Sequence, residues 1–165
     1  MNSPLRPATA IAYGTFIVGS LDLLDAIIFF GLRGVTPLRI LQGIAAGLLG
    51  RASFDGGSAT GALGALLHFS IAFAIVTTYF LASRRLRSLT SHPFLYGPLY
   101  GVAVYLVMNL IVVPLSAATA ARKSLAVIVN GLLIHVCGVG LPTAICTRAA
   151  SPPLRAYGVR TREDP

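Results

Sequence analysis

The chain has 165 residues, of which 55% are hydrophobic and only 11% are charged. A soluble domain usually carries about 25% charged residues on its surface, so this composition excludes an ordinary soluble enzyme. The net charge of +8 does not indicate nucleic-acid binding, because the basic residues lie between apolar runs, where charges flank membrane spans. We therefore expect a single-domain integral membrane protein.

Four apolar runs are long enough to cross a bilayer, which takes about 20 helical residues. Backbone groups in hydrocarbon must find partners within their own segment, so these runs predict helices. None shows the alternation of a membrane β-strand. The predicted spans cover residues 8–32, 58–83, 94–115 and 125–147. Together they form an all-α, four-helix transmembrane domain over residues 1–150.

A further helix is predicted over residues 37–49, between the first two spans. Pro37 can open this helix, and apolar residues such as Leu41 and Ala45 recur at helical spacing. Arg39 interrupts the apolar set, which favours an amphipathic helix in the membrane interface. A re-entrant helix is the alternative.

The Lys and Arg residues are distributed unevenly over the two sides of the predicted bundle. The N-terminal segment, the loop after residue 83 and the C-terminal tail share one side and carry eight of them, against five on the other side. Because positive charge favours cytoplasmic loops, we expect a bacterial inner-membrane protein with both termini in the cytoplasm. Residues 151–165 are polar and contain proline, which predicts a disordered basic cytoplasmic tail.

Six polar side chains interrupt the spans, where an ionisable group costs at least a few kcal/mol. They are Asp22, Asp25, His68, Asn109, Asn130 and His135. Counted from the outer helix ends at 1.5 Å per residue, all six lie at a depth of about 8–15 Å, in the outer half of the membrane. Because separate helices place these groups at similar depth, we predict a shared polar site.

Glycines share helix faces with several of these polar residues. Residues three, four and seven positions apart lie on one face, and small residues let membrane helices approach closely. The glycines predicted to pack between helices are Gly57, Gly61, Gly64, Gly97, Gly101, Gly131 and Gly138. We therefore expect the polar residues to face one another rather than the lipid.

Each polar residue also has a purely structural interpretation. Asn109 and Asn130 are typical of hydrogen bonds between membrane helices, and a single histidine is more often packed in a core than bound to a metal. Asp22 and Asp25 are harder to explain by packing, because two carboxylates one turn apart repel each other unless they are protonated or paired. An Asp–His hydrogen bond kept only for packing is the alternative.

The later part of the chain resembles a known group of proteins. Three strings carry the resemblance: HFSIAFAIVTTYFLASRR from His68, YGVAVYLVMNLIVVPLS from Tyr100 and NGLLIHVCGVGLPTA from Asn130. They resemble the uncharacterised YagU-like type of small multi-pass bacterial inner-membrane protein, with its membrane histidine and its late Pro-Leu in the third span. The resemblance implies location and architecture, and it assigns no role to any residue.

Three functions fit these features. The first is proton- or cation-linked transport, with the Asp and His residues of the spans as exchangeable sites. The second is an accessory role, in which glycine-rich faces pack against a second copy of the chain or a larger membrane complex. The alternative is a b-type haem anchor with His68 and His135 as axial ligands; otherwise we expect no cofactor.

We do not expect an enzyme. The sequence contains neither a nucleophile elbow nor a metalloprotease helix motif. The expected partner is the lipid bilayer, and no nucleic acid is expected.

Overall fold

A computed structural model describes residues 5–119 and 123–151, and these residues form an all-helical chain. Four helices are long and apolar enough to cross a membrane, which indicates a multi-pass membrane protein. The four spans are Pro7–Gly31, Gly57–Ser83, Pro93–Leu115 and Leu125–Ala149. The predicted spans coincide with these four helices, with ends that differ by at most two residues. The predicted tail over 151–165 lies, beyond Ser151, outside the described residues.

The first and third spans begin at prolines, and the third and fourth spans each contain a π-helical segment, called a π turn below. Pro7 and Pro93 occupy the first helical turn, where a missing N–H costs nothing. The elements are α1 (Pro7–Gly31), α2 (Pro37–Leu49), the 3-10 turn η1 (Gly50–Phe54), α3 (Gly57–Ser83), α4 (Ser88–Ser91), α5 (Pro93–Val107), the π turn η2 (Met108–Val112), α6 (Val113–Leu115), α7 (Leu125–Ile134), the π turn η3 (His135–Gly140) and α8 (Leu141–Ala149).

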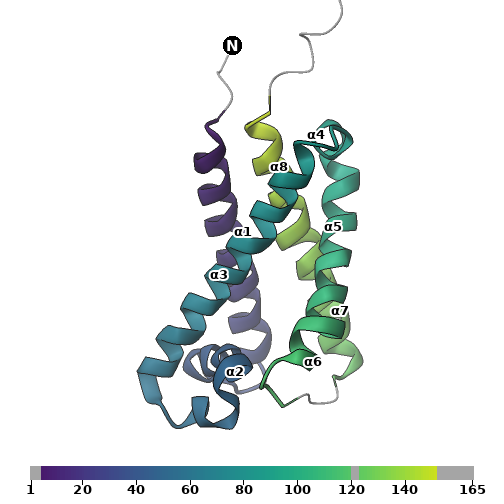
Figure 1. Ribbon diagram of the computed structural model, residues 1–165. Coiled ribbons are helices and arrows are strands. Elements are labelled where there is room, and N and C mark those ends of the chain that lie inside the picture. The colour runs from purple at the N-terminus through teal and green to yellow at the C-terminus, as the bar shows by residue number, and fades with distance from the viewer. Residues whose placement is uncertain (1–4, 120–122, 152–165) are drawn as a thin grey trace, which may run out of the picture.

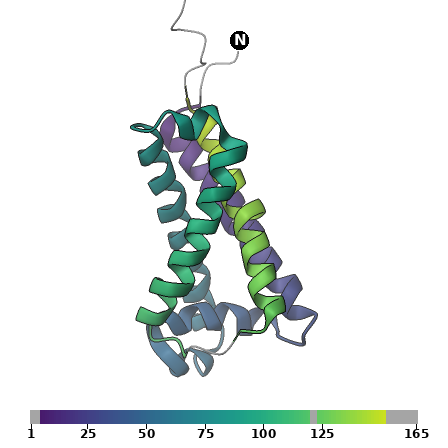
Figure 2. The ribbon, with the colours of Figure 1, turned by 90° about the vertical axis from the view of Figure 1, so that its right-hand side faces the viewer.

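The four spans run up and down between two ends of the molecule (Figures 1 and 2). The starts of α1 and α5, the end of α8 and the short α4 lie at one end, which we call the terminal end. There the Leu5 N–H donates to the carbonyl of Ala149 at 3.0 Å. The opposite end, called the α2 end, holds α2, η1 and α6.

Helix α2 crosses the ends of the spans rather than running along them (Figure 2). Thr36 caps it by accepting a hydrogen bond from the Arg39 N–H at 3.3 Å. Glycines let it press on α3, because a Cβ at Gly64 would overlap the carbonyl oxygen of Leu41. The side-chain amide of Gln42 also donates to the carbonyl of Gly57 at 3.1 Å. The predicted helix over 37–49 therefore exists and is anchored on α3.

An apolar core near the middle of the bundle separates the polar residues from the half of the molecule near the terminal end. Val18, Ala72, Val76, Val104 and Val139 bring all four spans together there. Aromatic side chains add contacts between α3 and α5: the rings of Tyr79 and Tyr100 lie 4.9 Å apart, and Tyr100 Oη donates to the carbonyl of Ile75 at 2.7 Å. This half of the molecule is closed by packing.

The third and fourth spans cross with their backbones in contact. A Cβ at Gly101 would overlap the carbonyl oxygen of His135, and one at Gly140 would overlap the carbonyl oxygen of Gly97. Only glycine leaves room for such an approach. Gly140 was not among the predicted packing glycines, although it faces the two that were.

The other predicted packing glycines divide into two groups. Gly61 packs against Leu38 of α2, Gly131 against Tyr105 of α5, and Gly138 close to Leu21 of α1. Gly57 differs from the prediction, because an added Cβ there meets no atom within 4 Å. Its φ of +57° at the start of α3 is a left-handed conformation that favours glycine, so the turn into the helix explains this residue.

The spans diverge toward the α2 end (Figures 1 and 2). Both later spans contain a π turn there, and each turn ends two residues before a proline, Pro114 or Pro142. A proline lacks the N–H of the helical ladder, and its ring crowds the carbonyl four residues earlier. We attribute the wider π turns to this crowding.

The glycine crossing gives a first prediction. Gly101→Ala must push the backbone of the fourth span away, so we expect it to destabilise the protein by about 1–3 kcal/mol, as overpacking does. Gly43→Ala is the matched control on α2, because its Cβ meets no atom within 4 Å. Alanine is the better helix former by about 1 kcal/mol, so this control should be neutral or slightly stabilised. Thermal unfolding of detergent-purified protein, followed by circular dichroism, measures both; equal stability of the two variants would contradict the crossing.

Candidate functional site

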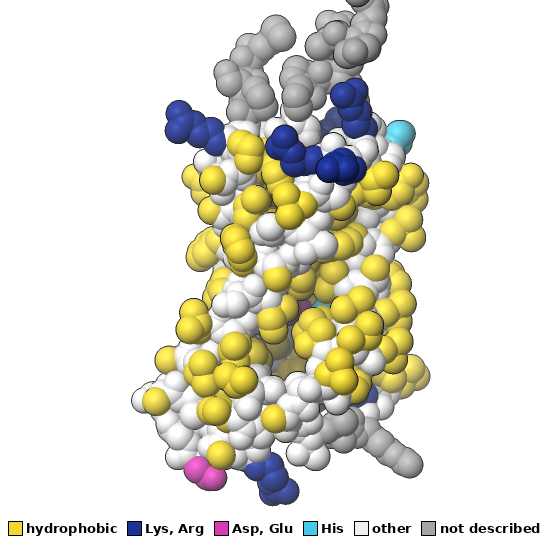
Figure 3. Space-filling model, viewed as in Figure 1, with side chains coloured by type: hydrophobic (Ala, Val, Ile, Leu, Met, Phe, Trp, Pro, Cys, Tyr) yellow, Lys and Arg dark blue, Asp and Glu magenta, His cyan; other side chains and the backbone are white. Residues whose placement is uncertain are grey.

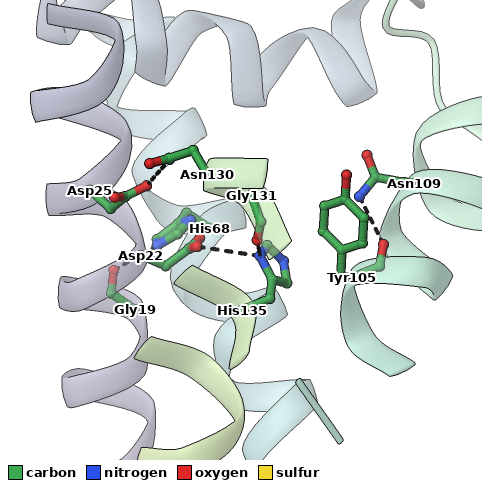
Figure 4. Close-up of polar contacts among 9 residues, drawn as sticks. All are labelled: Gly19, Asp22, Asp25, His68, Tyr105, Asn109, Asn130, Gly131 and His135. Carbon is green, nitrogen blue, oxygen red and sulfur yellow. Dashed lines mark hydrogen bonds and ion pairs between the residues drawn. The ribbon is translucent and has the colours of Figure 1, made fainter. Parts of the chain in front are cut away.

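The predicted polar residues come from all four spans and lie in the half of the molecule near the α2 end (Figure 4). Asp22 and Asp25 follow each other by one turn on α1, and His68 comes from α3. Asn130 belongs to α7, whereas Asn109 and His135 belong to the π turns η2 and η3. The π turn is a rare conformation that occurs often at functional sites. The structure therefore brings these residues into one region.

Asp22 lies closest to His135 among the ionisable groups of the site. Its Oδ1 is 4.0 Å from Nδ1 of His135, and the two side chains are 29% and 17% exposed. The ionisable groups near Asp22 are His135, His68 and Asp25. A separation of 4.0 Å is too long for a hydrogen bond. No described residue donates a hydrogen bond to this carboxylate.

The two histidines are held by backbone carbonyls. Nε2 of His68 lies 2.7 Å from the carbonyl oxygen of Gly19, and Nδ1 of His135 lies 2.8 Å from that of Gly131. A carbonyl only accepts, so each of these nitrogens carries the hydrogen. The His135 ring also packs edge-on against Tyr105, with ring centroids 5.5 Å apart. These contacts fix both rings at the site.

The hydrogen bonds also bear on the haem hypothesis. With Nε2 of His68 donating to Gly19, only its Nδ1, next to the side-chain stem, is left to bind a metal. His135 keeps Nε2 available, in the arrangement common for ligating histidines, but one such residue does not make the predicted pair of axial ligands. We therefore do not propose haem binding.

Asp25 has a different partner from Asp22. Nδ2 of Asn130 donates to Oδ2 of Asp25 at 2.7 Å, which joins α7 to α1. This bond agrees with the structural interpretation of Asn130 as a residue that holds two membrane helices together. The two aspartates thus share a helix face, but only Asp25 has its carboxylate satisfied.

Asn109 does not bond to the other predicted residues. Its Nδ2 donates to the carbonyl of Tyr105 on its own helix at 2.8 Å, and its Oδ1 accepts a hydrogen bond from Nζ of Lys123. Sequence reasoning did not place Lys123 at the site, because it lies just before the fourth span. A long side chain at a helix end can reach back along the helix. A lysine directly before the fourth span was therefore the sequence feature that could have indicated this contact.

Two cavities border the polar residues. The larger cavity has a volume of about 500 Å³, lies between α1, α2, α3, η2 and η3, and is lined by Asp22, His68, Asn109 and His135 among mostly apolar side chains. The smaller cavity, of about 180 Å³, is lined by Asp22, Asp25, Lys123 and Asn130 among others. Asp22 and His135 border both cavities. In Figure 3 a hollow opens above the α2 end, with acidic and histidine atoms visible deep inside it.

Comparison of this chain with protein-family models, with curated proteins and with solved structures gives no match. The functional argument therefore depends on the geometry of the site.

The bond between Asp25 and Asn130 gives a second prediction. A hydrogen bond between membrane helices contributes about 0.5–2 kcal/mol, so Asp25→Ala and Asn130→Ala should each destabilise the protein, while the double variant should lose less than the sum. Unfolding in detergent measures this coupling energy. Asp25→Ala combined with Ser70→Ala is the control, since Ser70 Oγ bonds only to the Leu66 carbonyl of its own helix; the prediction fails if both pairs are equally additive.

Proposed function

We propose that this chain is a proton- or cation-linked transport protein in which Asp22 binds and releases the proton or cation. The supporting observation is the Asp22 carboxylate, which is half-buried in a span, borders two cavities and receives no hydrogen bond from any described residue. Such groups are expensive inside a membrane and are the usual components of proton and ion pathways. His68 and His135 stand beside it, and histidine exchanges protons near neutral pH.

The proposed location is a bacterial inner membrane, with both termini in the cytoplasm. Arg6, Arg84, Arg85, Arg87 and Arg148 are exposed at the terminal end, and Figure 3 shows the basic side chains gathered there. Cytoplasmic loops of membrane proteins carry an excess of Lys and Arg. In this orientation α2 lies in the outer interface, with Arg39 exposed, rather than entering the membrane. The YagU-like resemblance implies the same location.

In this orientation the site is closed toward the cytoplasm. The cavities occupy the half near the α2 end, and the core of Val18, Val76, Val104 and Val139 closes the cytoplasmic half. A transport cycle then requires this packed core to loosen while the outer half closes. Such alternation around a site near the membrane centre is the general scheme of secondary transport.

An accessory role has less support from the geometry. That hypothesis assigned the glycine faces to a partner, but Gly64, Gly97 and Gly101 are used for contacts within the chain. A second copy or a larger complex would have to bind other surfaces. The unsatisfied carboxylate would also have no purpose in such a role.

The transport proposal predicts ion flux that depends on Asp22. Purified protein in liposomes loaded with a pH-sensitive dye should admit protons under an imposed pH gradient, with valinomycin and K⁺ compensating the charge. Asp22→Asn should reduce the rate to the leak of protein-free liposomes, because asparagine cannot exchange a proton. Asp55→Asn is the control, since Asp55 is exposed outside the spans. A wild-type rate equal to the leak, for both H⁺ and Na⁺ gradients, would refute the proposal.

The orientation gives a separate prediction. Single cysteines at Ser58 and Ser88, which are exposed at opposite ends, can be introduced after Cys137 and Cys146 are replaced. A membrane-impermeant maleimide should label Ser58→Cys in spheroplasts, and Ser88→Cys only after permeabilisation. The reverse pattern would show that the termini face outward.

A further inference from the structure

We infer that the larger cavity binds a lipophilic organic cation, whose charge pairs with Asp22 and whose apolar body occupies the space between α1, α2 and α3. This inference names a substrate class for the proposed transport site and so rests on the proposed function. It is carried by the size of the cavity, by the carboxylate on its wall that receives no hydrogen bond from a described residue, and by the side from which the cavity opens.

The cavity has the dimensions and lining of a site for a small organic molecule. Its volume of about 500 Å³ falls within the range of about 300–1,000 Å³ that is common for ligand sites. Most lining side chains are apolar, including Phe30, Ile44, Ile71 and Val112. A hydrated inorganic ion gains nothing from such walls, whereas an apolar body buries its surface against them.

Among the polar groups on the wall, the Asp22 carboxylate is the strongest partner for a cation. His68 and His135 donate to backbone carbonyls, and the Asn109 carboxamide is engaged at both ends by Tyr105 and Lys123. The Asp22 carboxylate keeps its acceptor capacity. In a mostly apolar site a carboxylate attracts a cation far more strongly than in water, so charge complementarity selects a cation over a neutral or anionic molecule.

The cavity opens to the side rather than toward an end of the molecule. Helices α3 and α5 meet at Tyr79 and Tyr100 and diverge toward the α2 end (Figure 1), and the hollow in Figure 3 lies on that face of the molecule. Helix α2 closes the end, because Ile40, Gly43, Ile44 and Gly47 line the cavity from there. For helices that cross a membrane, this opening faces the lipid, where lipophilic cations accumulate.

Tetraphenylphosphonium is the probe, and equilibrium dialysis of the detergent-purified full chain is the measurement. We expect saturable binding of one cation per chain, weakened by about tenfold or more in Asp22→Asn, a loss of at least 1.4 kcal/mol by the standard conversion. Tetraphenylborate, which has the same shape and the opposite charge, should not bind saturably. Circular dichroism and gel filtration verify that each variant remains folded.

A second variant tests the cavity without removing the charge. Gly43 lines the larger cavity, and an added Cβ there meets no atom within 4 Å. We therefore expect Gly43→Phe to occupy part of the cavity and to block the cation while Asp22 stays in place. Gly31→Phe is the matched control, at a glycine that is equally unobstructed but does not line the cavity. Gly31→Phe and Asp55→Asn should bind the cation like the wild type.

Three results would overturn the inference: no saturable binding of the cation, equal binding of the borate, or unchanged binding in both Asp22→Asn and Gly43→Phe. The dialysis needs no membrane and no gradient, so its outcome is separate from the flux assay. Cation binding without ion flux would support the ligand site and refute transport. Ion flux without cation binding would support transport and refute this ligand.

Discussion

The close crossing of the third and fourth spans is the constraint on which the rest of the structure depends. Gly97, Gly101 and Gly140 bring two backbones into contact in the half of these spans nearer the terminal end. Two straight helices that are tilted relative to each other and touch at one point must separate on both sides of that point. On the terminal side, α8 packs against α1 and α3. On the other side the helices diverge (Figure 2), and both cavities lie in the space between them.

The polar site follows from this divergence. Asn130 lies close enough to α1 to satisfy Asp25, whereas Asp22 faces the space where no helix supplies a donor. An unsatisfied charge in a span costs several kcal/mol, and the apolar packing of the other half must offset that cost. The bundle is thus divided into a tightly packed half, whose residues stabilise the fold, and an open half, whose polar residues are available for chemistry. Substitutions in the core and at Asp22 should therefore separate these two properties.

The sequence predicts the spans well, because length and hydropathy alone determine which segments can cross a bilayer. The face shared by Asp22 and Asp25 also follows from helical periodicity. Contacts between helices are harder to predict. The role of Gly57 depends on a backbone angle, and the bond between Asn109 and Lys123 depends on how far a side chain reaches back from a helix end. Neither leaves a periodic signal, and no motif distinguished the free carboxylate of Asp22 from the bonded one of Asp25.

The two π turns have a consequence for how this chain compares with other sequences. A π turn is equivalent to one extra residue inserted into an α-helix. Removing one residue within Met108–Val112 or His135–Gly140 can restore a regular helix without rotating the segments on either side. The same deletion elsewhere in these spans would turn every later residue by about 100°, one residue's share of a helical turn. The segments from Asn109 to Pro114 and from His135 to Pro142 can therefore vary in length by one residue, and the helices on either side still present the same faces.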